Sequence, residues 1–209
     1  MAGYFLTFEG IDGCGKSTQA QLLGSALERT GHDVVLTHEP GATRLGRQLR
    51  SALLEVEGLV SDTAEVLLLA ADRAQHLDEV IRPALDQGKV VISDRYADST
   101  RAYQGFGRGV DRELLERAIA LATRGLEPDL TILIDVDLVV ARDRSQTTPD
   151  RLEREPDAFF QRVQAGFRDL ARLSPDRFSI VDASQSIDET ADAVLATVCT
   201  RLPDLNQSA

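Results

Sequence analysis

The sequence predicts an α/β protein built on a five-stranded parallel sheet with helices on both faces. Short apolar runs alternate with longer segments of helical periodicity, and this alternation is typical of a parallel sheet covered by helices. The candidate strands are Phe5–Phe8, Val34–Thr37, Val90–Ser93, Leu130–Ile134 and Phe178–Val181. Because ligands bind beyond the carboxyl ends of the strands in such sheets, the polar residues that follow these runs are the first candidates for a site.

The helices are predicted from the spacing of apolar residues and from signals at the helix ends. Gly31 and Gly125 follow two of these segments, as expected of residues that end a helix. Ser186 and Glu189 form a capping box ahead of the last helix, and Thr43 is a candidate N-cap after the second strand. The predicted helices are Gln19–Arg29, Ala64–Leu85, Asp111–Thr123, Asp157–Leu173 and Ser186–Arg201.

Length and composition indicate a globular protein of one domain. The 209 residues contain no linker, repeat or low-complexity tract, so we expect a single domain over residues 1–209. The net charge of −11 argues against nonspecific binding to nucleic acid, whose phosphates it would repel. No apolar run approaches the ~20 residues of a membrane span, and we expect no signal peptide. With only Cys14 and Cys199, the chain suits a reducing cytoplasm.

The most specific motif is the glycine-rich segment between the first strand and the first helix. Its residues Gly10-Ile-Asp-Gly-Cys-Gly-Lys16-Ser17 match G-x-x-x-x-G-K-[ST], the phosphate-binding P-loop. The glycines allow backbone N–H groups to approach phosphate oxygens, and a chance glycine-rich turn is the alternative. We expect Lys16 to reach the β- and γ-phosphates and the Ser17 hydroxyl to bind Mg²⁺. The predicted ATP-binding residues here are Gly10, Ile11, Asp12, Gly13, Cys14, Gly15, Lys16, Ser17 and Thr18.

Polar groups follow the second and third strands as well. Asp94 and Arg95 come directly after the third strand, where the arginine fork suits a phosphate and the carboxylate suits Arg95 itself or a hydrated Mg²⁺. A surface ion pair is the alternative for these two residues. Glu39 and Pro40 follow the second strand, where the alternative is a plain connection between strand and helix.

An arginine-rich segment over residues 142–156 is a candidate lid. Four arginines within 13 residues surround a polar Thr-Thr-Pro segment, which suits a mobile loop that carries positive charge toward a transferred phosphoryl group. The alternative is a solvated loop that neutralises itself, because Asp143, Asp150 and Glu153 balance most of the charge.

Taken together, these segments resemble the thymidylate kinase family of P-loop nucleoside-monophosphate kinases. The resemblance runs from Phe5 to about Ala193. It rests on Phe8-Glu-Gly-Ile-Asp-Gly-Cys-Gly-Lys-Ser-Thr-Gln19, Glu39-Pro-Gly41, Ala71-Asp-Arg-Ala-Gln-His76, Asp94-Arg-Tyr96, Ser99-Thr-Arg-Ala-Tyr-Gln-Gly105, Gly107-Arg-Gly109 and Asp182-Ala-Ser-Gln185. It implies a P-loop nucleoside-monophosphate kinase fold with a short lid, transfer of the γ-phosphoryl group of ATP to dTMP with Mg²⁺, and a homodimer.

The resemblance also implies a role for individual residues. Arg95 corresponds to the arginine that binds the dTMP phosphate, Arg73 to the one that binds a thymine carbonyl, and Tyr103 to the aromatic ring that crowds the 2′ position of the sugar. The implied catalytic residues are Lys16, Arg95, Arg151 and Asp12. The implied dTMP-binding residues are Asp12, Glu39, Pro40, Leu69, Arg73, Arg95, Ser99, Thr100, Tyr103 and Gln104. Arg142, Ala183 and Gln185 join the ATP-binding set, and Ser17 and Asp94 are the metal candidates.

The P-loop sets the class of the chain within the family, and three other places depart from the family pattern. Gly13 and Cys14 fill P-loop positions where the other class of the family has arginine, so the lid must supply the charge. Arg151 is the leading candidate for that charge, followed by Arg142 and Arg144, in a lid that is poorer in arginine than usual. Leu69 stands where relatives usually place a phenylalanine that stacks on the base, and His38 and Ala42 depart from the usual Arg-Glu-Pro-Gly-Gly-Thr run.

Several alternatives remain open from the sequence. Because Leu69 replaces the usual phenylalanine, one alternative is a P-loop kinase that acts on another small acceptor, such as a deoxynucleoside or a different monophosphate. A regulatory or partitioning P-loop NTPase would hydrolyse ATP without any monophosphate. Cys14 is either a reactive thiol at a helix N-terminus or a small inert filler. His76 either approaches the site from one turn after Arg73 or is a satisfied surface or interface histidine.

Overall fold

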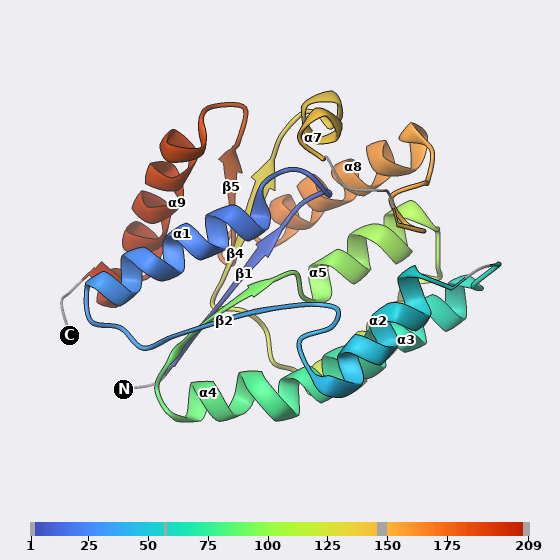
Figure 1. Ribbon diagram of the computed structural model, residues 1–209, viewed down its shortest axis with the longest axis horizontal. Coiled ribbons are helices and arrows are strands. Elements are labelled where there is room, and N and C mark those ends of the chain that lie inside the picture. Colours follow the sequence, from blue (N-terminus) through green and yellow to red (C-terminus); the bar gives the residue numbers. More distant parts are fainter. Residues whose placement is uncertain (1–2, 57, 146–149, 207–209) are drawn as a thin grey trace.

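The computed structural model describes residues 3–56, 58–145 and 150–206, and Figure 1 shows a central sheet between two layers of helices. The predicted sheet is confirmed, because its five strands are all parallel and stand in the order β2-β3-β1-β4-β5. The strands are β1 (Tyr4–Glu9), β2 (Val34–His38), β3 (Val90–Asp94), β4 (Leu130–Asp135) and β5 (Phe178–Asp182). Each therefore ends one residue beyond its predicted apolar run, on a polar side chain.

All five predicted helices are present. The predicted helix Ala64–Leu85 is one continuous helical segment that passes from α3 through a π-helical stretch, Leu77–Ile81, into α4. The capping box of Ser186 and Glu189 is confirmed. The helices are α1 (Lys16–Arg29), α2 (Arg44–Leu54), α3 (Asp62–His76), α4 (Arg82–Asp86), α5 (Ala97–Thr100), α6 (Arg112–Thr123), α7 (Leu138–Arg144), α8 (Asp157–Leu173), α9 (Ile187–Arg201) and a 3₁₀ turn at Pro203–Asn206.

Three helical segments go beyond the sequence-based assignment. For α2 the sequence indicates only the start, and Thr43 does cap it by accepting a hydrogen bond from Gly46 N at 2.9 Å. α5 continues into a π-helical stretch, Arg101–Gly107, and α7 follows β4. These last two carry too few apolar residues at helical spacing to be recognised alone.

The alternation of side chains along the strands builds a core on each face of the sheet. Leu6 on β1 and Ile92 on β3 belong to the cluster that includes Leu23 of α1 and Val198 of α9. Phe5 of β1, next in sequence to Leu6, belongs to the opposite cluster with residues of α3, α4 and α6. In Figure 1, α1 lies beside α9, and α2 lies beside α3 across the sheet from them.

The parallel arrangement brings the polar ends of the strands to one edge of the sheet. Asp94 at the end of β3 is in register with His38 of β2 and with Phe8 of β1, one residue before Glu9. The P-loop, the loop after β2 and the loop after β3 therefore meet at this edge. Within the described residues, no helix has the length and the apolar character needed to cross a membrane.

Candidate active site

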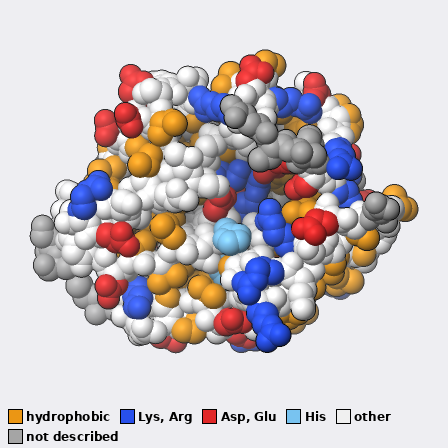
Figure 2. Space-filling model, in the orientation of Figure 1, with side chains coloured by type: hydrophobic (Ala, Val, Ile, Leu, Met, Phe, Trp, Pro, Cys, Tyr) orange, Lys and Arg blue, Asp and Glu red, His pale blue; other side chains and the backbone are white. Residues whose placement is uncertain are grey.

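A large cavity opens at this edge of the sheet. Figure 2 shows a hollow near the centre of this face, surrounded by basic and acidic side chains. The predicted P-loop residues from Asp12 to Thr18 line it, together with Asp94, Ala183 and Gln185. Gly10 and Ile11 contribute through their backbone instead, because Gly10 O accepts a hydrogen bond from Arg95 and Ile11 O accepts one from Lys16.

The P-loop conformation depends on glycine at one crowded position. Gly13 has a φ of 78°, and a Cβ atom built there would lie 2.1 Å from Ala141 O at α7. Lys16 is buried and donates to Ile11 O at 2.8 Å, with Cys14 Sγ at 3.8 Å from its Nζ. Burial raises the pKa of the Cys14 thiol, although the charge of Lys16 opposes this effect. These facts favour the inert filler over the reactive thiol.

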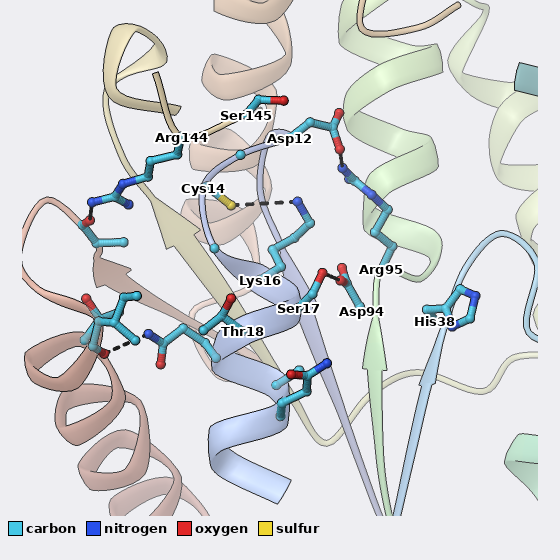
Figure 3. A pocket seen from close by; sticks show the side chains of 18 of the residues that line it. Asp12, Cys14, Lys16, Ser17, Thr18, His38, Asp94, Arg95, Arg144 and Ser145 are labelled. Carbon is cyan, nitrogen blue, oxygen red and sulfur yellow. Dashed lines mark hydrogen bonds and ion pairs between the residues drawn. The ribbon is translucent and has the colours of Figure 1, made fainter. Parts of the chain in front are cut away.

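Arg95, Asp12 and Tyr103 form a compact polar cluster at the mouth of the loop. Arg95 pairs with the Asp12 carboxylate, as Figure 3 shows, and also donates to Ser99 Oγ at 2.9 Å. Tyr103 donates its hydroxyl to Asp12 Oδ2 at 2.8 Å. Burial alone would raise the pKa of Asp12, but the charges of Arg95 and Lys16 outweigh it and lower the pKa to about 2. Asp12 is therefore ionised and anchors the guanidinium at neutral pH.

Arg95 occupies an unusual backbone conformation with a φ of 74°. A left-handed residue other than glycine costs about 1–3 kcal/mol and persists only when its surroundings impose it. Here the buried carboxylate of Glu9 accepts hydrogen bonds from Tyr96 N at 2.8 Å and from Ser99 Oγ at 2.5 Å. The backbone of Arg95 also donates to Phe8 O at 2.9 Å. The sequence analysis did not single out Glu9, which fixes Tyr96 and Ser99 beside Arg95.

A second pocket adjoins the first and shares Asp12, Glu39, Arg50 and Arg95 with it. All ten residues that the sequence analysis assigns to dTMP lie in its lining: Asp12, Glu39, Pro40, Leu69, Arg73, Arg95, Ser99, Thr100, Tyr103 and Gln104. The structure thus brings together residues from four separate segments of the chain. Two buried side-chain oxygens in this lining, Thr100 Oγ1 and Gln104 Oε1, have no hydrogen-bond partner among the described residues.

Glu39 supports one wall of this second pocket. Its buried carboxylate accepts from Arg73 Nε at 2.8 Å and contacts His76 Nδ1 at 2.9 Å. His76 is fully buried, and its Nε2 lies 2.6 Å from Thr37 Oγ1. His76 is thus satisfied by hydrogen bonds, as one alternative from the sequence holds, but it is not at the surface, and it does not line either pocket. It supports Glu39 from behind, and Glu39 in turn holds Arg73.

The lid arginines have different surroundings. Arg144 lines the P-loop cavity and donates to Ala183 O at 3.0 Å. Arg142 pairs with Asp157 and stacks on the Phe160 ring, with 5.5 Å from its guanidinium carbon to the ring centroid. The structure does not bring Arg142 to either pocket. Residues 146–149 of the expected lid lie outside the described residues.

Arg151 is held away from the P-loop cavity. Its guanidinium donates to Glu65 Oε2 at 2.6 Å and to Leu53 O at 2.8 Å. The residues on either side of it, Asp150 and Leu152, line the second pocket. This geometry does not support the phosphoryl-transfer role that the sequence assigns to Arg151.

Arg50 on α2 is a site residue that the sequence analysis missed. It lines both pockets and donates to Pro40 O at 3.0 Å. The available signal was its position two turns after the Thr43 cap, on a helix that starts at the ligand edge of the sheet. Its charge also contributes, after burial, to a lowered pKa of His38.

Ser17 and Asp94 face each other at the floor of the cavity (Figure 3), where the Ser17 hydroxyl donates to Asp94 Oδ2. The other carboxylate oxygen, Asp94 Oδ1, is buried without a hydrogen-bond partner among the described residues. A hydroxyl and a carboxylate oxygen that lacks a partner fit a hydrated Mg²⁺, which takes its other ligands from water and phosphates. The described residues contain no cluster of three or more His, Cys, Asp and Glu side chains that could hold a metal by themselves.

The fold and the two adjoining pockets define a P-loop kinase for a small acceptor, because the cavity at the phosphate-binding loop shares Asp12 and Arg95 with a second pocket beside it. Comparison with known proteins gives the particular family. The family model described as thymidylate kinase matches residues 8–194. The chain belongs to the thymidylate kinase family.

Similar proteins agree over nearly the whole chain. It is 51% identical to a thymidylate kinase of Gloeobacter violaceus over 198 residues, which covers 93% of each chain. It is 48% identical to a thymidylate kinase of Clavibacter michiganensis over 197 residues, again with 93% of each chain covered. The crystal structure of thymidylate kinase from Ehrlichia chaffeensis superposes with a TM-score of 0.80 at 35% identity, over 95% of this chain and 100% of that one.

Proposed function

We propose that this chain transfers the γ-phosphoryl group of ATP to dTMP and releases ADP and dTDP. Family membership supports the reaction. The observation that carries it to this site is the pair of adjoining pockets that share the Asp12–Arg95 ion pair. One pocket suits a nucleoside triphosphate on the P-loop and the other suits a monophosphate, and the shared arginine lies where the two phosphates would meet.

On the donor side, the P-loop backbone and Lys16 hold the ATP phosphates. Lys16 donates to Ile11 O in this structure and would exchange that carbonyl for phosphate oxygens, which are stronger acceptors because they are charged. Ala183 and Gln185 line the same cavity and would contact the adenosine end.

Ser17 and Asp94 are the residues that would hold Mg²⁺. A divalent ion held there would supply positive charge to the phosphates during transfer. Asp94 supplies the buried oxygen that has no other partner among the described residues.

On the acceptor side, Arg95 binds the dTMP phosphate, Arg73 and Thr100 contact the base, and Tyr103 closes the pocket at the sugar. The Tyr103 hydroxyl is fixed by Asp12 at 2.8 Å, so its ring cannot swing away easily from a ribose 2′-hydroxyl. Leu69 covers the base on one face of the pocket. Crowding alone excludes an added hydroxyl only weakly, so kcat/KM for dTMP should exceed that for ribosyl-TMP by about 10² at most.

The chemistry then depends on position and charge, because phosphoryl transfer needs little covalent help from the protein. Lys16 and Arg95 both line the P-loop cavity and would supply positive charge to the transferred group. Among Arg142, Arg144 and Arg151, Arg144 alone lines the P-loop cavity, and we propose it as the lid cation that acts on ATP.

We also propose a cytoplasmic homodimer with no nucleic-acid partner. Exposed leucines at Leu67 of α3 and at Leu114 and Leu121 of α6 support an apolar contact between copies, since α3 and α6 pack against each other. The charge of −11 supports the absence of a nucleic-acid partner.

A coupled ADP-release assay with Mg·ATP tests the reaction against its alternatives. Fast turnover with dTMP and slower turnover with dUMP is the expected result among dTMP, dUMP, ribosyl-TMP, dCMP, AMP and thymidine. Turnover with a different acceptor would keep a kinase and reject dTMP, an outcome that Leu69 keeps open. ATP loss that is independent of every acceptor would instead indicate an NTPase.

A further inference from the structure

Glu65 of α3 is a fully buried carboxylate that lies behind the second pocket and is not part of its lining. Its Oε1 accepts a hydrogen bond from Gln104 Nε2 at 2.7 Å, and its Oε2 accepts one from Arg151 Nη2 at 2.6 Å. Arg108 lies at 3.4 Å from the same carboxylate. Three donors therefore converge on one buried anion, and one of them is the amide of a pocket residue.

The charge of Glu65 decides which end of that amide faces the pocket. Burial raises the pKa of Glu65, but the hydrogen bonds from Gln104 and Arg151 and the charge of Arg108 outweigh it and lower the pKa overall. An ionised carboxylate only accepts hydrogen bonds, so Gln104 must turn its NH₂ group toward Glu65. The opposite end, Gln104 Oε1, is then the end without a partner among the described residues.

The pocket thereby presents an acceptor and a donor. The acceptor is Gln104 Oε1, and the donor is Arg73 Nη1. Arg73 donates to Glu39 through Nε and to Tyr96 O through Nη2 at 2.9 Å, and its Nη1 has no acceptor among the described residues. A base edge that offers a ring N–H beside a carbonyl oxygen, as in thymine and uracil, matches this pair. Cytosine offers a ring nitrogen without hydrogen and an amino group at the same positions.

We propose that Glu65 is a positioning residue that sets base specificity: it orients the Gln104 amide so that its oxygen accepts from the ring N–H of the base. Arg151 and Arg108 serve as counter-ions that keep Glu65 ionised in a buried place. This inference rests on the proposed dTMP kinase function and assigns a role to Arg151 that its contacts support.

The test compares dTMP with its 3-deaza analogue, in which C–H replaces the ring N–H. A site built around a hydrogen bond rejects a substrate that lacks the donor, because a buried polar atom then stays unpaired. We expect the wild-type protein to favour dTMP by at least tenfold in kcat/KM. In Glu65→Gln the new amide can donate or accept, so the Gln104 side-chain amide can adopt either orientation. The preference for dTMP over the analogue should then fall to about threefold or less.

A double-mutant cycle separates this role from a structural one. Gln104→Leu removes the amide, so the preference should already be lost there and Glu65→Gln should change it no further. A purely structural role would lower kcat/KM for both substrates equally in Glu65→Gln, and that result would overturn the proposal, as would an unchanged preference. Glu113→Gln, an exposed carboxylate on α6, is the matched control and should retain the wild-type preference.

Two further arms keep the result interpretable. If thermal unfolding shows that Glu65→Gln does not fold, Glu65→Asp retains the charge for Arg108 and Arg151 but withdraws it from Gln104, and the same loss of preference is expected. If the wild-type protein does not phosphorylate dTMP at all, the proposed function fails. If it does and the Glu65 variants keep the preference, only the present inference fails.

Discussion

The P-loop and the second pocket are built in opposite ways. The loop takes its donors from contiguous residues, Gly10 to Thr18, and its shape from glycines. The pocket takes its side chains from distant segments, and buried glutamates hold them in place. Glu9 acts on Arg95 through Ser99, Glu39 holds Arg73, and Glu65 holds Gln104 and Arg151.

The difference shows where precision comes from in each region. A backbone loop needs no support beyond its own turn geometry, because N–H groups are fixed by the main chain. Long side chains such as arginine lose about 1.5–2 kcal/mol of rotamer entropy when they are ordered. A buried carboxylate fixes the guanidinium before substrate arrives, so that this loss is incurred on folding and not on binding.

The largest expected effect is on the loop. Gly13→Ala places a Cβ 2.1 Å from Ala141 O, at a φ of 78°. The left-handed conformation costs about 1–2 kcal/mol and the overlap about 1–3 kcal/mol more. We expect a lower free energy of unfolding and a raised KM for ATP, measured by denaturant titration and steady-state kinetics.

Gly15→Ala is the matched control for the overlap. Gly15 also has a positive φ, 104°, but nothing lies within 4 Å of the added Cβ. The difference between the two variants isolates the overlap with α7. Equal destabilisation would mean that the loop depends on backbone conformation alone and not on its fit against Ala141.

The next effect concerns the pocket. Arg95→Ala removes charge-assisted hydrogen bonds worth about 1.5–3 kcal/mol each and should lower kcat/KM for dTMP by roughly 10², mainly through KM. Arg95→Gly should lose the same activity yet unfold at higher denaturant, because glycine adopts the φ of 74° without strain. Equal stability of the two variants would show that Glu9 imposes no strain on Arg95.

The sequence predicted the P-loop segment and most of the lining of the second pocket, but not the buried residues that support that lining. The five strands and all five assigned helices follow from local patterns, and the contact residues follow from motifs. The stretch Arg101–Gly107 depends on packing instead: Gly107 leaves room for the Phe159 ring, with 2.5 Å from its hypothetical Cβ to that ring, and Gly166 does the same for Phe106. No local pattern encodes such a fit.

Glu9 and Glu65, two of the three supporting glutamates, were missed for a related reason. Glu9 and Ser99 are 90 residues apart, and Glu65 and Gln104 are 39 apart. A single acidic residue in an apolar strand or helix shows no partner in one sequence. The same holds for His76, whose burial against Glu39 became visible only when β2 and α3 were placed together.

A smaller effect links one of these glutamates to pH. Burial, helped by Asp98, raises the pKa of Glu9 from its usual 4.5 to about 7, so the folded protein binds a proton that the unfolded chain releases between these values. The free energy of unfolding should therefore fall as the pH rises through this window, by up to about 1.4 kcal/mol per unit. Glu9→Gln should lack this contribution.

Urea titrations of both proteins at pH 5 and pH 8 measure the contribution of Glu9. Relative to the wild type, the variant should gain stability between these two values. Asp72, whose pKa burial and Glu39 raise to about 6, adds a slope of the same sign to both proteins and cancels in the difference. A stability gap that does not change with pH would show that Glu9 stays ionised in the folded protein.

The smallest effect tests whether the pocket is already optimal for its base. Leu69 lines the pocket where relatives usually carry an aromatic ring, and its side chain is half-buried. An aromatic pair adds about 0.5–1.5 kcal/mol beyond the area it buries, so Leu69→Phe should lower the dTMP KM by about 2- to 12-fold. The kcat should change little, because stacking holds substrate and transition state equally. A raised KM would mean that the pocket is packed around leucine and has no room for the ring. The fit of the apolar wall would then depend on the surrounding structure and not on the motif, as the positions of the buried glutamates do.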